Sequence, residues 1–254
     1  MKRSMDRIPI AVQLYSVRGA CEQDLPGALE AIYDMGYEGV EFAGYYGRSA
    51  AELREMLDGL KLRVAGSHTP LDHLLGDNLE ATVEFNKTLG NQCIIVPSLP
   101  GERRGSRDAW IETARLFNEL AAKLKPHGLR VGYHNHSSEF KPIDGEPPLD
   151  IFLGNTGPDV LMQLDVGNAL RGGADVASFI RRYPGRQRTV HLKEYSSKNK
   201  NALLGEGEAP WKELFRLCET VGDTEWYIVE QETYPYEPLE CIARCLENLD
   251  AMGK

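Results

Sequence analysis

Short apolar runs alternate along the chain with longer segments whose apolar residues recur at a different period. Eight of the short runs predict β-strands, because they are rich in β-branched and aromatic residues and are bounded by turn residues. They cover residues 10–16, 39–43, 63–68, 93–98, 130–136, 160–166, 188–194 and 226–232. Each run begins about 25 to 38 residues after the one before, close to the repeat of a strand–loop–helix–loop unit.

The segments between these runs have the 3.6-residue period of amphipathic helices. In residues 25–36, Leu25, Leu29 and Ile32 fall on one face, and Gly36 can end the helix. Similar patterns occupy residues 51–60, 109–128, 209–222 and 238–253. Strict alternation of strands and helices predicts parallel strands joined by right-handed crossovers.

Eight strand–helix units favour closure into one (β/α)₈ TIM barrel, an α/β fold whose single domain would span residues 1–254. An open doubly wound sheet is the alternative, and it would normally carry a glycine-rich nucleotide turn after its first strand. The segment QLYSVRGACEQD follows here and has no G-x-G-x-x-G motif. The Pro- and Gly-rich stretch at 141–148 is interpreted as a long βα loop.

Charge and hydropathy exclude several kinds of partner. The net charge is −9 with no long basic run, which argues against a nucleic-acid partner. The compact basic group at 181–188 is interpreted as a solvated helix end and loop. No run of about 18 apolar residues exists, so we expect no membrane span. The opening MKRSMDRIPI lacks the apolar stretch of a signal peptide and predicts a ragged terminus.

The cysteines favour a reducing, cytoplasmic setting. Their number is five, an odd count with wide spacing, which argues against a disulfide framework. Cys241 and Cys245 fall on one face of a predicted helix. They fit two small buried residues better than a zinc pair, which stays the alternative.

Polar residues gather where the later strands end, the position at which barrel enzymes carry their chemistry. With period 2, the members of each of four pairs point the same way: His134 with His136, Gln163 with Asp165, His191 with Lys193, and Glu230 with Glu232. Burying so many ionisable groups is costly unless they are paired or hold a cation. Imidazole with carboxylate suits Zn, Mn, Co or Fe better than Ca, and predicts a shared divalent metal site.

Several segments carry a resemblance that extends from residue 12 to residue 232. They are VQLYSVR, GYEGVEF, GSHTPL, GYHNHSSEF, LDVGNA, HLKEY, LLGEGEAPW and WYIVEQE. On these segments the chain resembles the sugar phosphate isomerase/epimerase family of the xylose isomerase-like TIM barrel superfamily. That superfamily includes inosose dehydratases, tagatose epimerases, hydroxypyruvate isomerases, dehydroshikimate dehydratases and the endonuclease IV group.

The resemblance implies a divalent metal cofactor (Mn, Zn, Co, Fe or Mg). Asp165, His191 and Glu230 match three metal ligands of the family. The fourth is commonly a Glu on strand five, where this chain has His134, and imidazole can also ligate. In many relatives that Glu is one of two carboxylates that move a proton between neighbouring sugar carbons, so this chain would use other groups.

The candidate catalytic residues are His136, Lys193 and Glu230. His136 can act as a general acid or base at neutral pH. Lys193 can have a lowered pKa or hold an enolate oxygen, and its alternative is an ion pair with Glu230 or Glu232. The resemblance implies that matching His and Lys positions take part in catalysis in dehydratase-like relatives.

Other residues are candidates for substrate binding, and the resemblance places several of them at the cavity: Glu41, His68, Asn168, Glu206 and Glu232. His68 has a structural hydrogen bond as its alternative. Asn168 stands where many relatives have His, and it can hydrogen-bond a hydroxyl without shuttling a proton. Glu206 alternatively caps a helix starting near Pro210. Tyr15 and Trp211 are candidates either for stacking on a sugar or for core packing.

The leading functional hypothesis is a metal-dependent isomerase or epimerase of a sugar, keto-sugar or cyclitol, which abstracts a proton next to a metal-bound carbonyl. A dehydratase or lyase with the same metal site is the main alternative. A non-catalytic carbohydrate-binding barrel is another, and a nucleic-acid repair enzyme would need more metal ligands and a basic groove. The partner implied is a small-molecule sugar or sugar derivative. A homo-oligomer stays open, because relatives often form dimers or tetramers.

Overall fold

A computed structural model describes residues 7–254; the segment 1–6, part of the predicted ragged terminus, lies outside the described residues. Within that range, parallel strands pair in chain order and the last closes on the first, so the sheet is a closed barrel. The strands are β1 (Ile10–Gln13), β2 (Gly39–Ala43), β3 (Arg63–His68), β4 (Cys93–Val96), β5 (Arg130–His134), β6 (Val160–Asp165), β7 (Thr189–Leu192) and β8 (Trp226–Val229). The predicted (β/α)₈ TIM barrel is confirmed.

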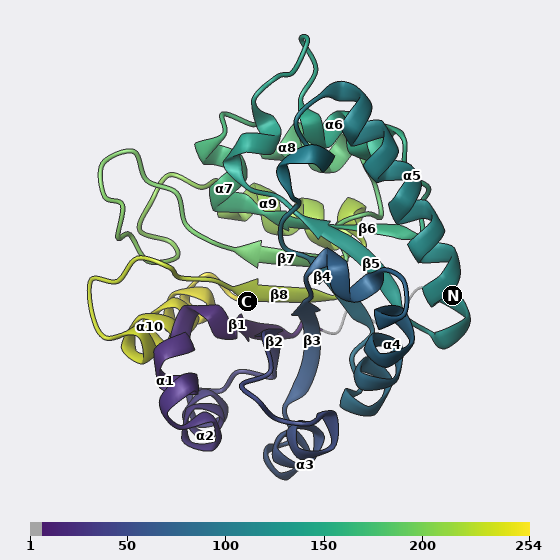
Figure 1. The fold of residues 1–254 in the computed structure, drawn as a ribbon. Coiled ribbons are helices and arrows are strands. Elements are labelled where there is room, and N and C mark those ends of the chain that lie inside the picture. The colour runs from purple at the N-terminus through teal and green to yellow at the C-terminus, as the bar shows by residue number, and fades with distance from the viewer. Residues whose placement is uncertain (1–6) are drawn as a thin grey trace.

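Helices surround the strands and form the outer layer (Figure 1). They are α1 (Arg18–Gln23), α2 (Leu25–Met35), α3 (Ala50–Leu60), α4 (Asn78–Leu89), α5 (Arg107–Leu124), α6 (Pro148–Gly154), α7 (Val166–Arg171), α8 (Val176–Arg182), α9 (Trp211–Leu217) and α10 (Pro238–Ala251). Their apolar faces pack against the outward side chains of the strands and form the main core. The five predicted helices are all present, as α2, α3, α5, α9 and α10, and five further helices are additional to them: α1, α4, α6, α7 and α8.

Six predicted strands extend too far at their carboxyl ends, and at two of these ends a side-chain hydrogen bond starts a helical turn. The Gln13 side chain accepts the backbone N–H of Tyr15 and starts a short 3₁₀ turn, Leu14–Val17. Asp165 Oδ1 accepts the backbone N–H of Asn168 at 2.7 Å and caps α7. At both of these ends, the side chain of the last strand residue caps a helical turn, and the residues after it are predicted from the sequence to continue the strand.

The interior of the barrel has an apolar floor and a polar upper part. Ala11, Ala65 and Ile228 form a small buried cluster inside the barrel, partly covered by Trp226. Above it, towards the carboxyl ends of the strands, the buried side chains are polar: Gln13, Glu41, Gln163, His134, Asp165 and His191. Since polar groups buried together must satisfy one another, this upper part contains a dense hydrogen-bond network.

At the other end of the barrel, a cluster of ion pairs joins Arg130, the first residue of β5, to the residues just before β7 and β8. Glu225, just before β8, accepts hydrogen bonds from Arg130 at 2.6 Å and from Arg188 at 2.6 Å. Burial opposes the ionised carboxylate, but the two guanidinium groups hold the pKa of Glu225 below its usual range. Residues at this amino-terminal face of a barrel usually serve stability rather than chemistry.

The stretch 141–148 forms a loop closed by a bridge between Ile143 and Glu146, as interpreted from the sequence, and α6 begins at Pro148. The basic group at 181–188 is only partly a solvated surface. Arg181 and Arg182 form exposed ion pairs, whereas Arg186 is buried and donates to the carbonyl of Val160 at 2.8 Å. Arg186 therefore satisfies the first residue of β6, which the charge pattern alone does not reveal.

All five cysteines are buried and free, so the interpretation of Cys241 and Cys245 as small core residues fits their placement in α10. Among residues 7–254, no helix combines the length and the apolar composition needed to cross a bilayer.

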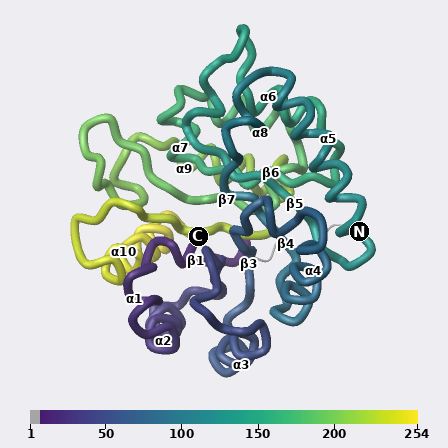
Figure 2. Tube along the Cα trace, viewed as in Figure 1, coloured from purple at the N-terminus to yellow at the C-terminus, as the bar shows by residue number. Residues whose placement is uncertain are grey.

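Two long loops at the mouth of the barrel lie side by side, one after β7 and one after β8 (Figure 2). The hydroxyl of Thr233 donates to the carbonyl of Lys200 at 2.6 Å and joins them. Glu194 anchors the first loop, because its buried carboxylate accepts from the backbone N–H of Gly205 at 2.7 Å and from Nε1 of Trp211 at 2.8 Å. These loops therefore form one wall of the mouth.

Candidate active site

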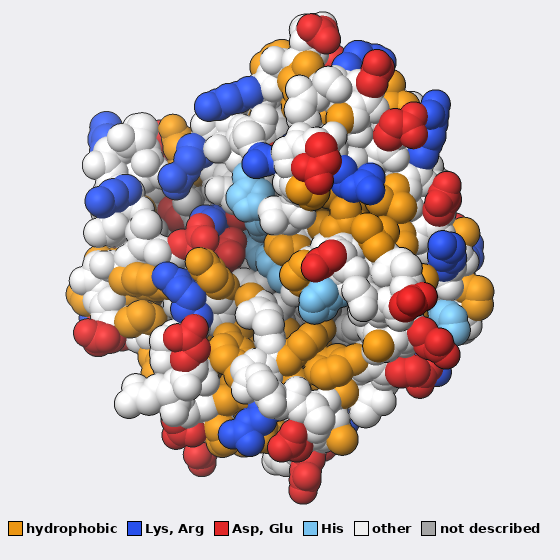
Figure 3. Space-filling model, in the orientation of Figure 1, with side chains coloured by type: hydrophobic (Ala, Val, Ile, Leu, Met, Phe, Trp, Pro, Cys, Tyr) orange, Lys and Arg blue, Asp and Glu red, His pale blue; other side chains and the backbone are white. Residues whose placement is uncertain are grey.

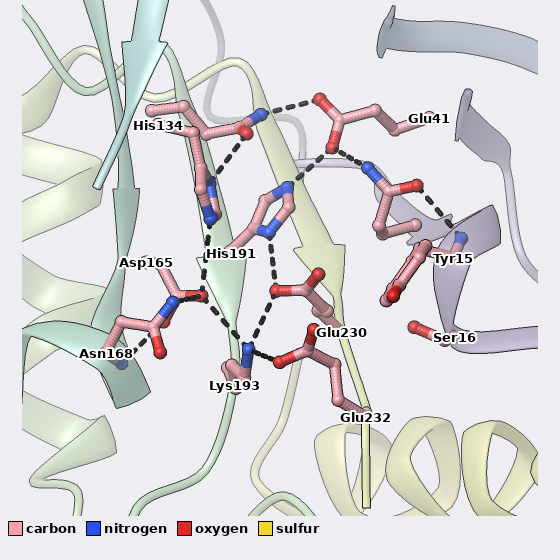
Figure 4. A network of polar contacts seen from close by, with 12 residues as sticks. Tyr15, Ser16, Glu41, His134, Asp165, Asn168, His191, Lys193, Glu230 and Glu232 are labelled. Carbon is pink, nitrogen blue, oxygen red and sulfur yellow. Dashed lines mark hydrogen bonds and ion pairs between the residues drawn. The ribbon is translucent and has the colours of Figure 1, made fainter. Parts of the chain in front are cut away.

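Four residues from consecutive strands converge at the mouth of the barrel. His134 ends β5, Asp165 ends β6, His191 lies in β7, and Glu230 directly follows β8. All four side chains are buried, and one ligand atom from each lies within 4.8 Å of those from the others. The structure thus brings together the four residues that the sequence singles out as candidate metal ligands (Figure 4).

The donor set fits a divalent metal ion. His134 Nε2 lies 3.8 Å from Asp165 Oδ2, and His191 Nδ1 lies 3.1 Å from Glu230 Oε2. Two imidazole nitrogens and two carboxylate oxygens are a common ligand set for Zn, Mn, Fe or Co. Buried carboxylates this close together also need a compensating positive charge.

The pKa values show how strongly these groups affect one another. Burial raises the pKa of Asp165 to about 7, while Lys193 opposes that rise. Burial works in the same direction on Glu230, but His191 and Lys193 outweigh it and hold the pKa of Glu230 well below its usual range. Burial, together with His191 and His68, lowers the pKa of His134 well below its usual value, so His134 is a neutral imidazole able to ligate.

Lys193 is held by carboxylates rather than left as a base. Its Nζ lies 3.4 Å from Glu230 Oε2 and 3.7 Å from Asp165 Oδ2, and it also hydrogen-bonds Glu232. Burial would lower the pKa of Lys193, but the three carboxylates outweigh burial and raise it. The expected lowering of this pKa is therefore wrong, and the alternative ion pair is present.

His136 and Glu232 lie nearest to solvent in this group. The His136 ring is exposed, lies edge-on to the ring of His134 with centroids 5.1 Å apart, and has its backbone N–H held by Glu139 at 2.9 Å. Partial desolvation lowers the pKa of His136, and the opposing effect of Glu139 is smaller. Because the pKa lies below its usual value, the ring is neutral at pH 7. The surface shows a hollow here, where histidine and acidic side chains meet (Figure 3).

Glu41 does not line the substrate cavity, which corrects the sequence-based expectation. Its side chain is fully buried and lies on the side of His191 opposite Glu230 (Figure 4). It accepts hydrogen bonds from Gln13 Nε2 at 2.7 Å, Gln163 Nε2 at 2.6 Å and His191 Nε2 at 2.5 Å. All three donors bind the carboxylate in the buried layer behind a candidate ligand, the usual place of groups that orient such ligands.

His68 and Asn168 are also engaged within the network. His68 Nε2 lies 2.7 Å from Gln163 Oε1, its ring stacks on that of His191, and the side chain is 11% exposed. Its structural hydrogen bond is therefore present, and contact with substrate stays a prediction. Asn168 donates from Nδ2 to Asp165 Oδ2 at 2.8 Å and orients that carboxylate.

Glu206, Tyr15 and Trp211 occupy three different settings. Glu206 is exposed in the loop after β7 and accepts the backbone N–H of Leu203 at 2.9 Å. The helix-cap alternative for Glu206 is wrong, because α9 starts at Trp211 without a side-chain cap. Trp211 is buried in the core, whereas Tyr15 is 41% exposed at the mouth beside Arg18.

Three residues of the site escape the sequence-based prediction: Gln13, Asn135 and Glu194. Asn135 accepts the backbone N–H of Asp165 at 2.9 Å and donates to its carbonyl at 3.1 Å, which fixes the end of β6. Gln13 and Asn135 are polar residues at the ends of apolar strands, and that signal could have found both. Glu194 is the last residue of the predicted strand 188–194 and carries the same signal, although its partners in the following irregular loop could not be predicted.

Fold and site together define a barrel with a buried imidazole–carboxylate cluster at the carboxyl ends of its strands. The family model described as "Xylose isomerase-like TIM barrel" matches residues 29–251, and the chain belongs to that family. Members of this family are enzymes, with dehydratases, epimerases and isomerases among the similar proteins.

The relatives carry names of two reaction types. The inosose dehydratase of Serratia proteamaculans (strain 568) is 24% identical, over 79% of this chain and 80% of its own length. A structure described as a sugar phosphate isomerase/epimerase from Parabacteroides distasonis ATCC 8503 is 28% identical, with a TM-score of 0.81 over 98% of this chain and 96% of its own. The structure of an IolI protein with a zinc atom, 14% identical over 96% of this chain and 97% of its own, shares the fold with a TM-score of 0.72.

Proposed function

We propose that the protein is a metal-dependent lyase or dehydratase that acts on a keto-sugar or keto-cyclitol. One observation carries the choice between elimination and isomerisation. At the end of β5, where the resemblance leads us to expect a second carboxylate, the buried ligand is the imidazole of His134. The site therefore lacks the strand-five member of the carboxylate pair that, by the resemblance, passes a proton between neighbouring carbons. This absence supports the lyase or dehydratase, which the sequence places second.

The residues that would hold the metal are His134, Asp165, His191 and Glu230. When bound there, a divalent ion acts as a Lewis acid that polarises a substrate carbonyl and acidifies the adjacent C–H. The zinc in the IolI structure supports such a site in this fold.

Two other groups supply the proton transfers that an elimination requires. His136, neutral and exposed at the rim, accepts the proton from the carbon next to the carbonyl. The electrons of that C–H bond form the new C=C bond, and the C–O bond at the β-carbon breaks. Lys193, held as an ammonium, gives a proton to the departing oxygen, since an alkoxide is more basic than the amine that remains. The products are an unsaturated ketone and water or an alcohol.

The substrate class follows from the relatives and from the character of the mouth. Inosose dehydratase is the name of several relatives, which supports a keto-cyclitol or a keto-sugar of similar size. Ammonium and imidazole groups beside carboxylates suit hydroxyl and carbonyl oxygens. The basic residues 181, 182 and 188 are paired with carboxylates, which gives no support to a nucleic-acid substrate.

Isomerisation or epimerisation is the second candidate, favoured by the relative described as a sugar phosphate isomerase/epimerase. Incubating the protein with Mn²⁺, Zn²⁺ or Co²⁺ and a panel of inososes and keto-sugars in D₂O separates the two reactions. An unsaturated ketone, detected by its ultraviolet absorbance and by NMR, supports the lyase. Deuterium exchange with an epimeric product and no elimination supports the second candidate instead.

Metal analysis of the purified protein tests the part that both reactions share. We expect about one divalent ion per chain and loss of activity with a chelator, restored by adding metal. A protein that binds no divalent metal, and whose activity ignores chelators, would overturn both proposals.

A further inference from the structure

We propose that Glu41 and Gln163 are positioning residues, and that the one carboxylate of Glu41 sets the tautomers of both imidazole ligands. This inference rests on the proposed metal site. It concerns the layer of side chains directly beneath the four candidate ligands, which is fully buried inside the barrel.

Glu41 contacts the Nε2 atom of His191, on the side of the ring opposite Glu230. A metal can bind His191 at Nδ1, beside Glu230, only when the remaining imidazole proton is on Nε2. Glu41 Oε2 lies 2.5 Å from that Nε2, and a carboxylate can only accept. Glu41 therefore keeps the proton on Nε2 and leaves Nδ1 for the metal.

Glu41 also fixes the orientation of the Gln163 side chain. Its Nε2 lies 2.6 Å from Glu41 Oε1, so the amide nitrogen must face Glu41 and donate to it. The amide oxygen then faces the other way, 3.1 Å from His134 Nδ1 and 2.7 Å from His68 Nε2. An amide oxygen only accepts, so His134 carries its proton on Nδ1 and presents the lone pair of Nε2 to Asp165 and the metal.

The backbone around Glu41 is shaped to hold its carboxylate in this position. The pairing of β2 with β3 shifts by one residue between Val40 and Glu41, which places Glu41 opposite Gly66. A Cβ atom at Gly66 would lie 2.7 Å from Glu41 Oε1, so any larger residue would push the carboxylate away. Gln13 Nε2 supplies a third donor at 2.7 Å.

We expect each single variant to disturb the imidazole ligands. In Glu41→Gln, the new amide donates to Gln163, whose side chain must then turn its own nitrogen towards His134 and its neighbour His68. In Gln163→Leu, His134 loses its acceptor altogether. Loss of such supporting contacts typically weakens metal binding by about 10- to 100-fold.

The exchanged pair Glu41→Gln with Gln163→Glu provides the rescue. The amide introduced at position 41 would donate from its nitrogen to the carboxylate at position 163 and accept from His191 through its oxygen. That carboxylate would in turn accept from His134 and His68, so both tautomers are restored. We therefore expect the double variant to recover most of the affinity that either single variant loses.

The test measures Co²⁺ affinity by competition with a chelator, together with the visible absorption spectrum of bound Co²⁺, for wild type, both single variants and the exchanged pair. Gln187→Leu is the matched control, because Gln187 is a fully buried glutamine outside this network. Weakened binding and altered spectra in the single variants, with rescue in the pair, support the proposal. Wild-type affinity and spectrum in either folded single variant overturn it.

Two further outcomes are informative. If the wild-type protein itself binds no Co²⁺ or Zn²⁺, the proposed metal-dependent function fails, and that result is distinct from unchanged binding in the variants. If Glu41→Gln does not fold, the Co²⁺ affinities of Gln163→Leu and of the exchanged pair test the proposal. An exchanged pair that folds and binds no better than Gln163→Leu then contradicts the proposal.

Discussion

Lys193 and Glu230 lie beside each other at the ends of neighbouring strands, with Nζ of the lysine 3.4 Å from Oε2 of the glutamate. Each stabilises the charged form of the other, which keeps the pKa of Lys193 high and that of Glu230 low. The same carboxylate is a candidate metal ligand, so Lys193 contributes to the charge balance of the candidate metal site.

Lys193→Met should reduce elimination by about 10²- to 10⁴-fold, the usual contribution of a positioned general acid. It should not weaken metal binding, because it removes a positive charge beside Asp165 and Glu230. Proton exchange next to the carbonyl should continue, since the base is intact. Steady-state elimination rates, Co²⁺ affinity and deuterium exchange by NMR measure the three effects.

A Lys193→Met variant that loses exchange and elimination equally would contradict the assigned role. Lys212→Met, on the exposed face of α9, is the control.

His136→Asn should abolish proton exchange and elimination together, each by about 10²- to 10⁴-fold, because both need the base. Metal affinity should stay at the wild-type level, since His136 is outside the four-ligand cluster. The comparison with Lys193→Met in one D₂O experiment separates the two roles. Retained exchange in His136→Asn would assign the base to another group.

Much of this site could be predicted because the geometry of a barrel strand is regular. Side chains alternate along a strand, and the carboxyl ends of parallel strands share one rim, so His134, Asp165, His191 and Glu230 could be brought together from sequence alone. The number and order of the strands follow from the same regularity, and so do their starting residues, except that β7 begins at Thr189 and not at 188. The ends of the strands do not, because capping by side chains such as Asp165 turns the chain early.

The role of Glu41 could not be predicted from its position in a strand. Its burial depends on the irregular pairing of β2 with β3 and on the space above Gly66, which are properties of two strands together. The raised pKa of Lys193 likewise depends on carboxylates from β6 and from the chain after β8. The pattern along one segment carries no information on such distances between segments.

Phe117→Ala should lower the free energy of unfolding by about 3–5 kcal/mol, the usual cost of deleting a buried aromatic ring. Phe117 is fully buried and lies edge-on to Phe152, with centroids 5.0 Å apart, and to Tyr133, which precedes His134. Phe117→Leu keeps most of the volume and should cost less. Urea unfolding at constant pH measures the free energy of unfolding of both variants. Equal losses in the two variants would contradict the prediction, because they would show that the core around residue 117 collapses to fill the space left by either replacement.

Glu225→Gln should destabilise the protein at pH 7, on the order of 1–2 kcal/mol, since the partly exposed carboxylate accepts charged hydrogen bonds from Arg130 and Arg188. Because the folded pKa of Glu225 lies below its unfolded value, this stabilisation is complete above the unfolded pKa, about 4.3, and is lost as the pH falls through the folded value. The difference in urea midpoint between wild type and variant should therefore be constant from pH 7 to about 5 and shrink below about 4.

Glu55→Gln, at an exposed position on α3, is the matched control and should show a much smaller difference. A difference for Glu225→Gln that stays the same at pH 3 would contradict the assignment, because it would not depend on the ionised carboxylate.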